Sequence, residues 1–155
     1  MSDPHFFVLD GGGSSCRAAL YGIDGHEIGR VTGDFANLTS DFETSCRHVE
    51  DIIKATYDAA GLSFDMRSRG IAVLGIAGAE FGDAASRLQA RLRFASSMVL
   101  SDREIGVAGI LGDADGTLAQ IGTGSFFVSR TGDKLVEVGG WGLVLGDECG
   151  GCFLL

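Results

Sequence analysis

The sequence predicts a layered α/β fold, in which strands and helices follow one another along the chain. Three observations predict it. A glycine-rich antiparallel β-meander opens the chain, helices and buried strands alternate after it, and the meander pattern starts again near Leu118. The 155 residues are 45% hydrophobic and 21% charged, so the chain is long enough to bury a core and too apolar for disorder.

The opening meander is predicted from short-range signals. The apolar stretch 6–9 is a predicted strand that runs into the turn from Asp10 to Ser14, which contains three glycines. Residues 16–21 and 27–32 are the predicted second and third strands. The Asp24-Gly25 pair between them is typical of a hairpin turn.

Helices and buried strands are predicted next. Ser40 and Glu43 have the spacing of a capping box, and apolar residues recur at helical intervals from there to Gly61. Residues 71–76 are a predicted parallel strand, 82–94 a helix and 98–100 a short strand. Ser101 and Glu104 repeat the capping-box spacing for a helix that ends near Gly112.

Segments 6–31 and 118–140 share one pattern. Each has an apolar strand, a Gly-x-Gly-Ser turn, a second strand, a short turn and a third strand. The offset of roughly 111 residues is too long for a solenoid repeat, so it predicts two domains of related fold. We expect one domain at residues 1–113 and the beginning of another at 114–155. The alternative is that any two β-hairpins look alike.

The two glycine-rich turns predict phosphate binding. Backbone N–H groups and hydroxyls in such turns can hold successive phosphates. Neither turn has the G-x-x-x-x-G-K-[ST] pattern of a P-loop, and neither opens a helix with the G-x-G-x-x-G pattern of a dinucleotide-binding fold.

Charge and hydropathy exclude other function classes. The net charge of −9 argues against a nucleic-acid partner. No apolar run approaches the roughly 20 residues that span a bilayer, and the first residues lack a basic segment and cleavage site. We therefore expect a cytoplasmic protein with no membrane partner, whose four cysteines are reduced.

Several motifs together resemble the superfamily of actin, hexokinase and the heat-shock chaperone ATPases. They are DGGGSS, FANLTSD, SDREIGVAGILGD, IGTGSF and above all GGWGLVLGDE. Within it, the chain is most similar to the N-terminal portion of the N-acetylglucosamine kinase family and its benzoyl-CoA reductase activator (BadF/BcrA-type) relatives. The resemblance implies ribonuclease-H-like domains and an ATP- and Mg²⁺-dependent kinase that phosphorylates the 6-hydroxyl of N-acetylglucosamine or glucosamine.

The resemblance also implies residue roles. Phosphoryl transfer needs a carboxylate that orients the attacking hydroxyl and accepts its proton, and groups that hold the phosphates. The implied catalytic base, which also binds the sugar, is Asp102, and Asp10 is implied to lie near the magnesium ion. The implied phosphate-binding residues are Gly12, Ser14, Gly122, Thr123 and Gly124, and the implied sugar-binding residues are Asn37, Gly140, Trp141, Gly142 and Asp147.

Each of these residues also has a purely structural interpretation. Asp102 could be an ordinary helix N-terminal charge and Asp10 a turn aspartate. Trp141 could belong to a core, and Asn37 could be a turn residue.

The chain departs from the family in two places. Kinases of this group usually continue Gly-Asp-Glu with Gly-Ser-Gly, whereas this chain has Cys149-Gly-Gly-Cys152. This keeps open the alternative of an ATPase activator for a CoA-linked dehydratase or reductase, since activators use cysteine near there to hold an iron–sulfur cluster. The family's adenosine-binding segment has no counterpart, so we expect the chain alone to have little kinase activity. Homodimerisation stays open.

Overall fold

The computed structural model describes residues 4–154. The chain forms two compact units, Met1–Asp102 and Arg103–Leu155. The sequence placed the division after Asp113. The structure assigns the helix between these two positions to the second unit, because Val107 of the helix and Leu111 directly after it pack on Leu118 and its neighbours.

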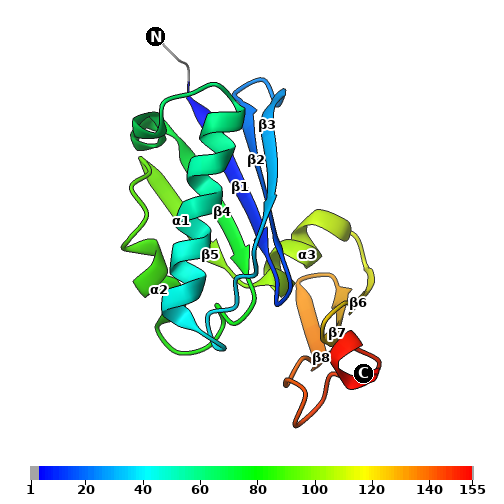
Figure 1. Ribbon diagram of the computed structural model, residues 1–155. Coiled ribbons are helices and arrows are strands. Elements are labelled where there is room, and N and C mark those ends of the chain that lie inside the picture. Colours follow the sequence, from blue (N-terminus) through cyan, green and yellow to red (C-terminus); the bar gives the residue numbers. More distant parts are fainter. Residues whose placement is uncertain (1–3, 155) are drawn as a thin grey trace. The chain divides into compact units, whose positions relative to one another are not determined.

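The first unit contains a five-stranded mixed sheet with the strand order β3-β2-β1-β4-β5. Strands β1 (His5–Gly11), β2 (Cys16–Gly22) and β3 (Glu27–Gly33) form the predicted antiparallel meander, and β4 (Ile71–Ile76) and β5 (Ser96–Leu100) run parallel to β1 (Figure 1). The predicted strands are all present.

One face of this sheet forms the core. Alternate residues of β1 are buried, as expected for a strand with one face on a core, and the buried set includes Phe7 and Leu9. Helix α1 (Phe42–Ala59) covers this face (Figure 1). It approaches β3 closely at Gly33, where a Cβ atom would lie 3.1 Å from the Cδ1 atom of Ile52.

The cap of α1 differs from the prediction. Asp41 is the N-cap residue, and its Oδ1 atom accepts a hydrogen bond of 3.0 Å from the Thr44 N–H. Ser40 instead donates its N–H to Asn37. Glu43 forms a bidentate ion pair with Arg91, with both contacts at 2.8 Å. The capping-box prediction is therefore wrong by one residue, although the predicted helix is confirmed.

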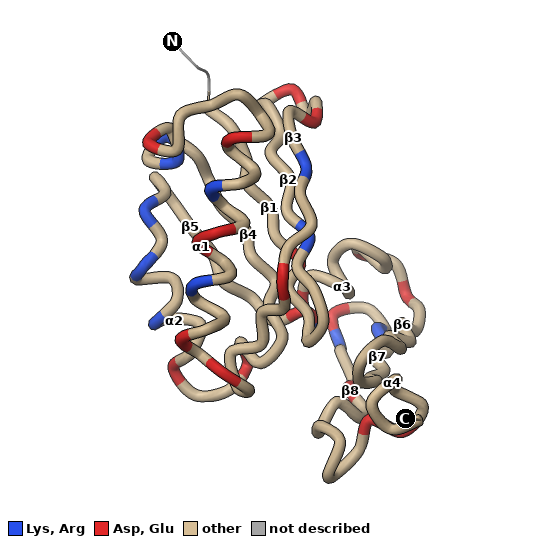
Figure 2. The backbone as a smooth tube through the Cα atoms, in the orientation of Figure 1, with Lys and Arg blue, Asp and Glu red and all other residues tan. Residues whose placement is uncertain are grey.

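The second predicted helix is shorter than expected. The 3₁₀ helix η1 (Phe64–Arg69) precedes β4, and α2 (Ala84–Gln89) covers only part of the predicted 82–94. The helix ends at Gln89, because the residues after it are held on the sheet instead. The Phe94 ring stacks on Phe7, with ring centroids 5.5 Å apart, and the Ala95 N–H donates a hydrogen bond to Gly70 O. Basic residues are frequent along α2 and the segment after it (Figure 2).

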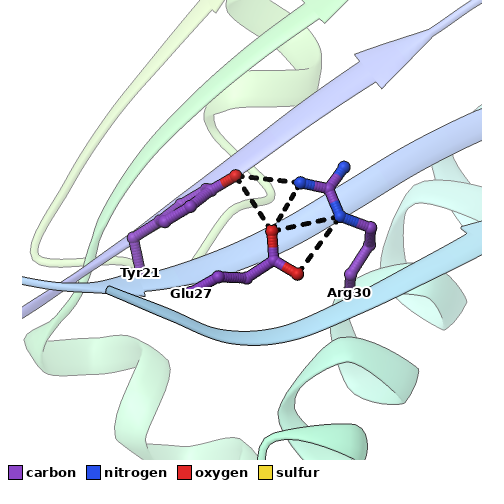
Figure 3. A network of polar contacts seen from close by, with 3 residues as sticks. All are labelled: Tyr21, Glu27 and Arg30. Atoms are coloured by element: carbon purple, nitrogen blue, oxygen red, sulfur yellow. Dashed lines mark hydrogen bonds and ion pairs between the residues drawn. The ribbon is translucent and has the colours of Figure 1, made fainter. Parts of the chain in front are cut away.

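The meander edge of the first unit carries a polar network on its surface. The Arg30 guanidinium donates to both carboxylate oxygens of Glu27 and to the Tyr21 hydroxyl, which itself lies 3.3 Å from Glu27 (Figure 3). The hydrogen bonds from Arg30 lower the pKa of Glu27 below its ordinary value. This network joins β2 to β3.

The second unit consists of a helix and a three-stranded sheet that share a small core. Helix α3 (Asp102–Ile110) begins at the last residue of the first unit and is followed by β6 (Gly116–Ile121), β7 (Ser125–Thr131) and β8 (Lys134–Gly139), an antiparallel sheet of order β6-β7-β8. A short helix, α4 (Gly151–Leu154), ends the described chain. The core is made of Val107, Leu118, Phe126 and Val128.

Among the residues that the structure describes, no helix is both long enough and apolar enough to cross a membrane.

Candidate active site

The candidate site of the first unit lies at one edge of its sheet. Strands β1, β4 and β5 are parallel, so their carboxyl ends lie at the same edge, where ligands bind in open α/β sheets. Asp10 and Gly12 lie at the end of β1, and Asp102 follows β5. The structure therefore brings the predicted base and the first glycine-rich turn to the same edge.

The first glycine-rich turn is held by backbone hydrogen bonds. Gly12 donates its N–H to Ser15 O and accepts from the Ala36 N–H, both at 3.0 Å. Ser14 is exposed at the tip of the turn. The Asp10 side chain lies on the exposed face of β1, 3.9 Å from Arg17 of β2. Ser14 and Asp10 are thus accessible to a ligand.

Asn37 lies beside the carboxyl end of β4, where it forms a parallel bridge with Ala77. Its Oδ1 atom accepts from the Thr39 N–H at 3.0 Å, from the Thr39 hydroxyl at 2.7 Å and from the Ser40 N–H at 3.2 Å. Asn37 therefore stabilises its own turn, as expected if it is a turn residue. Its Nδ2 donor takes no part in these bonds.

Gly78 packs the loop after β4 against the loop of Asn37. Its φ of +82° lies in the left-handed region that favours glycine, and a Cβ atom there would lie 2.9 Å from Thr39 N. The glycine thus fixes where the Asn37 loop sits at the sheet edge.

The second glycine-rich turn joins β6 to β7 in the second unit. The Gly122 N–H donates to Gly124 O at 2.9 Å. The segment after Asp147 returns to this turn, since the Gly151 N–H donates to Gly122 O at 2.7 Å and the Cys152 N–H to Thr123 O at 3.0 Å. The second glycine-rich turn and the segment after Asp147, which are distant in the sequence, are therefore joined by hydrogen bonds.

Asp147, at the start of the segment that bonds to the second glycine-rich turn, has an unusual environment. Its carboxylate packs against Gly124, where a Cβ atom would meet Asp147 Oδ2 at 2.2 Å. Its φ of 61° is in the left-handed region, and its Oδ1 atom is buried without a hydrogen-bond partner among the described residues. Strained backbone and an unsatisfied buried acceptor together are typical of functional sites.

The loop from Gly139 to Trp141 is held by Arg103 of α3. The Arg103 Nη2 atom donates to Gly140 O at 2.6 Å, and Nη1 lies 3.4 Å from Glu137. Gly140 and Gly142 have φ values of 70° and 80°. Trp141 is 68% exposed, so it is not a core residue and its indole can meet a ligand.

Three positioning residues were not predicted from the sequence. Arg103 holds Gly140, the Ser125 hydroxyl donates to Glu148 O at 2.7 Å, and Gly150 packs where a Cβ atom would lie 2.8 Å from the Gly124 backbone. Arg103 directly follows the predicted base and Ser125 is the serine of the second Gly-x-Gly-Ser turn, so these two lie within motifs that the sequence offered.

Two cavities in the described chain do not involve the predicted residues. One, of about 90 Å³, lies in the first unit between α1, η1 and the segment after α2. The other, of about 300 Å³, lies in the second unit and is lined by α3, β7 and β8, with Arg103 and Arg130 among its residues.

Comparison with known proteins identifies related kinases. The chain is 30% identical over 151 residues to glucosamine kinase from Vibrio cholerae, covering 97% of this chain and 51% of that protein. It is 28% identical over 149 residues to an N-acetylmuramic acid/N-acetylglucosamine kinase from Clostridium acetobutylicum, covering 92% of this chain and 48% of that protein. The chain thus spans about half the length of these curated relatives. No known protein-family profile matches it.

Solved structures agree with the predicted fold. A Chromobacterium violaceum protein solved as a candidate N-acetylglucosamine kinase superposes with a TM-score of 0.88 at 28% identity, covering 99% of this chain and 55% of that one. Glucokinase from Balamuthia mandrillaris superposes with a TM-score of 0.54 at 14% identity, covering 87% and 47%, which supports the fold alone. By sequence and fold, this chain is similar to about half of a glucosamine or N-acetylglucosamine kinase.

Proposed function

We propose that this chain carries sugar- and phosphate-binding parts of an ATP-dependent kinase that phosphorylates the 6-hydroxyl of glucosamine or N-acetylglucosamine. The observation that carries the proposal is the match to glucosamine kinase over 97% of the chain. The placement of Asp10, Gly12, Asn37 and Asp102 at one sheet edge of the first unit supports it, because this is where α/β sheets bind ligands.

In this proposal Asp102 is the catalytic base. It orients the 6-hydroxyl toward the γ-phosphate of ATP and accepts its proton. Its place in the first turn of the nine-residue helix α3 supports an ionised carboxylate, since the partial positive charge of a helix N-terminus favours an anion.

Each unit contains groups that can bind a sugar. Asn37 donates through Nδ2, because its oxygen is held within its own loop. Asp147 offers a carboxylate acceptor, and its buried Oδ1 atom has no hydrogen-bond partner among the described residues. Trp141 offers an exposed face for the apolar side of the ring, while Gly140 and Gly142 let the backbone approach.

Each unit contributes one glycine-rich turn with groups that can bind phosphate. The proposed phosphate-binding groups are the hydroxyls of Ser14 and Thr123 and the Gly124 N–H. The N–H groups of Gly12 and Gly122 are bonded to Ser15 O and Gly124 O, so these two glycines act by fixing the shape of the turns. Asp10 fits a magnesium site of the usual kind, in which one or two carboxylates act with the substrate phosphates, because its side chain is 55% exposed. Bound Mg²⁺ supplies charge neutralisation at the phosphates.

The test is a chimera in which this chain replaces the matched half of the Vibrio cholerae enzyme. We expect sugar-dependent ADP release from the chimera and little from the 155-residue chain alone. Asp102→Asn should lower the kcat of the chimera by about 10²-fold or more, because general-base catalysis contributes about 10²–10⁴-fold.

Asp133→Asn is the matched control. It makes the same chemical change at an exposed hairpin position, so it should leave kcat unchanged. Unchanged turnover in Asp102→Asn would remove Asp102 from the base role. A folded chimera that turns over neither amino sugar would overturn the proposed function.

A further inference from the structure

The Cys149-Gly-Gly-Cys152 segment is the one sequence motif that the proposed kinase chemistry does not use. Both cysteine side chains are exposed and neither is in a disulfide. The other two cysteines, Cys16 and Cys46, are free as well but buried. The chain therefore holds two classes of thiol, which differ in access to solvent.

The two classes also differ in reactivity. The thiolate is the species that attacks a disulfide or peroxide. Burial, with the nearby charges of Asp10 and Asp34, raises the pKa of Cys16 to about 12, and burial also raises the pKa of Cys46. Cys149 and Cys152 are thus the thiols that a dissolved oxidant can reach and oxidise.

The backbone between the two exposed cysteines can close a small ring. Gly150 and Gly151 separate them and add no side chain that would obstruct closure. Cys149 has a φ of 71°, and the Gly150 N–H bonds Asp147 O at 2.9 Å, so the chain turns sharply at this point. Two cysteines separated by two residues in a turn are a common arrangement of redox-active pairs.

This segment is bonded directly to the second glycine-rich turn. The Gly151 and Cys152 N–H groups donate to the carbonyls of Gly122 and Thr123, at 2.7 and 3.0 Å. Gly150 leaves no room for a Cβ atom against Gly124. A change in the backbone of the cysteine segment will therefore alter the geometry of that turn.

We propose that Cys149 and Cys152 form a reversible disulfide by exchange with a small-molecule disulfide, and that its closure changes the second glycine-rich turn. One thiol loses its proton, and its thiolate attacks a sulfur of the oxidant and expels a thiolate, which gives a mixed disulfide. The second thiol then loses its proton, and its thiolate attacks the protein sulfur of the mixed disulfide and expels the other thiolate. The two expelled thiolates take up the two protons. In sum, two protein thiols are oxidised while one disulfide is reduced to two thiols. That this turn binds phosphate rests on the proposed function; the disulfide itself does not.

A metal centre fits the same residues less well. Structural zinc takes four ligands, and within residues 4–154 there is no group of three or more His, Cys, Asp or Glu side chains that could hold a metal. The pair supplies two ligands, so a metal would require a second chain.

The test begins with thiol counting on the reduced 155-residue chain. We expect N-ethylmaleimide, which alkylates thiols without oxidising them, to label Cys149 and Cys152 in the native protein and all four cysteines after denaturation. Incubation with oxidised glutathione should give an intramolecular disulfide, seen as a mass loss of about 2 Da with a peptide that links positions 149 and 152. Cys149→Ser and Cys152→Ser should stop at the glutathione adduct, whereas Cys46→Ser should still close the ring.

The effect on the turn is measured by amide hydrogen exchange. Exchange at Gly151 and Cys152 should slow by about threefold or more on oxidation, because the closed ring restrains the donors to Gly122 and Thr123. Disulfides only between chains, or bound iron or zinc that is lost in Cys149→Ser, would overturn the proposed pair. Unchanged exchange in the fully oxidised chain would overturn its coupling to the turn.

Discussion

The side chain of Asn37 uses its oxygen within its own loop and leaves its nitrogen for other partners. Three hydrogen bonds to Oδ1, from Thr39 and Ser40, fix the orientation of the amide. A donor held in place in this way loses little conformational entropy when it binds. The structural and the functional interpretations of this residue are therefore compatible.

Asn37→Asp tests the role of the nitrogen separately from that of the oxygen. The carboxylate can still accept from Thr39 and Ser40, so the loop should keep its structure, but the Nδ2 donor is lost. We expect the KM for the amino sugar, measured in the chimera, to rise about 10–100-fold, since losing one hydrogen bond to a sugar hydroxyl costs about 1–3 kcal/mol.

Thr39→Val serves as the control for that substitution. It removes one donor to Oδ1 and leaves the Asn37 nitrogen in place, so KM should change by less than about threefold. An unchanged KM in Asn37→Asp with correctly folded protein would exclude Asn37 from the sugar site.

At the scale of elements, helix α1 joins the core to the loop of Asn37. Its first turn carries the Asp41 cap, and Ser45 in the next turn exchanges two hydrogen bonds with the Asn37 backbone, at 3.0 and 2.9 Å. The helix start and the site loop are therefore one structural unit, and loss of the cap will affect both.

Asp41→Ala should lower Tm by about 2–4 °C at pH 7, the usual effect of losing an N-cap in a chain of this size. The hydrogen bonds from Thr44 lower the pKa of Asp41 below its ordinary value of 3.8. Since the folded pKa is the lower one, this stabilisation is present above the ordinary pKa and is lost as pH falls through the folded pKa. The difference in Tm should therefore shrink as the pH is lowered below 3.8.

Two further variants test whether the loss of Tm comes from the N-cap hydrogen bond of Asp41. Asp41→Asn keeps a neutral acceptor and should retain most of the stability at both pH values. Asp51→Ala removes an exposed carboxylate in the middle of the same helix and should leave Tm nearly unchanged. Equal Tm losses in Asp41→Ala and Asp51→Ala would show that Asp41 does not cap the helix.

At the scale of the whole molecule, short-range sequence signals predicted which helices and strands form. Packing between residues distant in the sequence determined where some of them end. The meander and the parallel strands follow from alternation, glycine turns and apolar runs, and the structure confirms them. The length of α2 could not be predicted, because it depends on the stacking of Phe94 on Phe7.

The residues of the candidate site could be predicted from the sequence, but not all of their contacts. Motif resemblance selected Asp10, Asn37 and Asp102, and the parallel strand order places them at one edge of the first unit. The contact of Asp147 with Gly124 was not predictable, since it depends on how the segment after Gly146 returns to the second turn. No local pattern in the sequence encodes that return.

The sheet of the second unit leaves apolar side chains exposed, and we propose that it causes self-association. Phe127 of β7 lies opposite Val138 of β8 and Ala119 of β6, and Val138 is 63% exposed. Both outer strands, β6 and β8, lack a neighbour within the described sheet, and such edges are templates for strand pairing. The mean mass in sedimentation equilibrium should therefore increase with concentration.

Val138→Lys should reduce this association, because it places a charge on the exposed face beside an open strand edge. Ile23→Lys is the matched control: Ile23 is 65% exposed, but it lies in the turn between β2 and β3 of the first unit. It adds the same charge and should leave the association constant within about twofold. A wild-type chain that stays monomeric at all concentrations, or an equal effect of both lysines, would show that this sheet is not the surface involved.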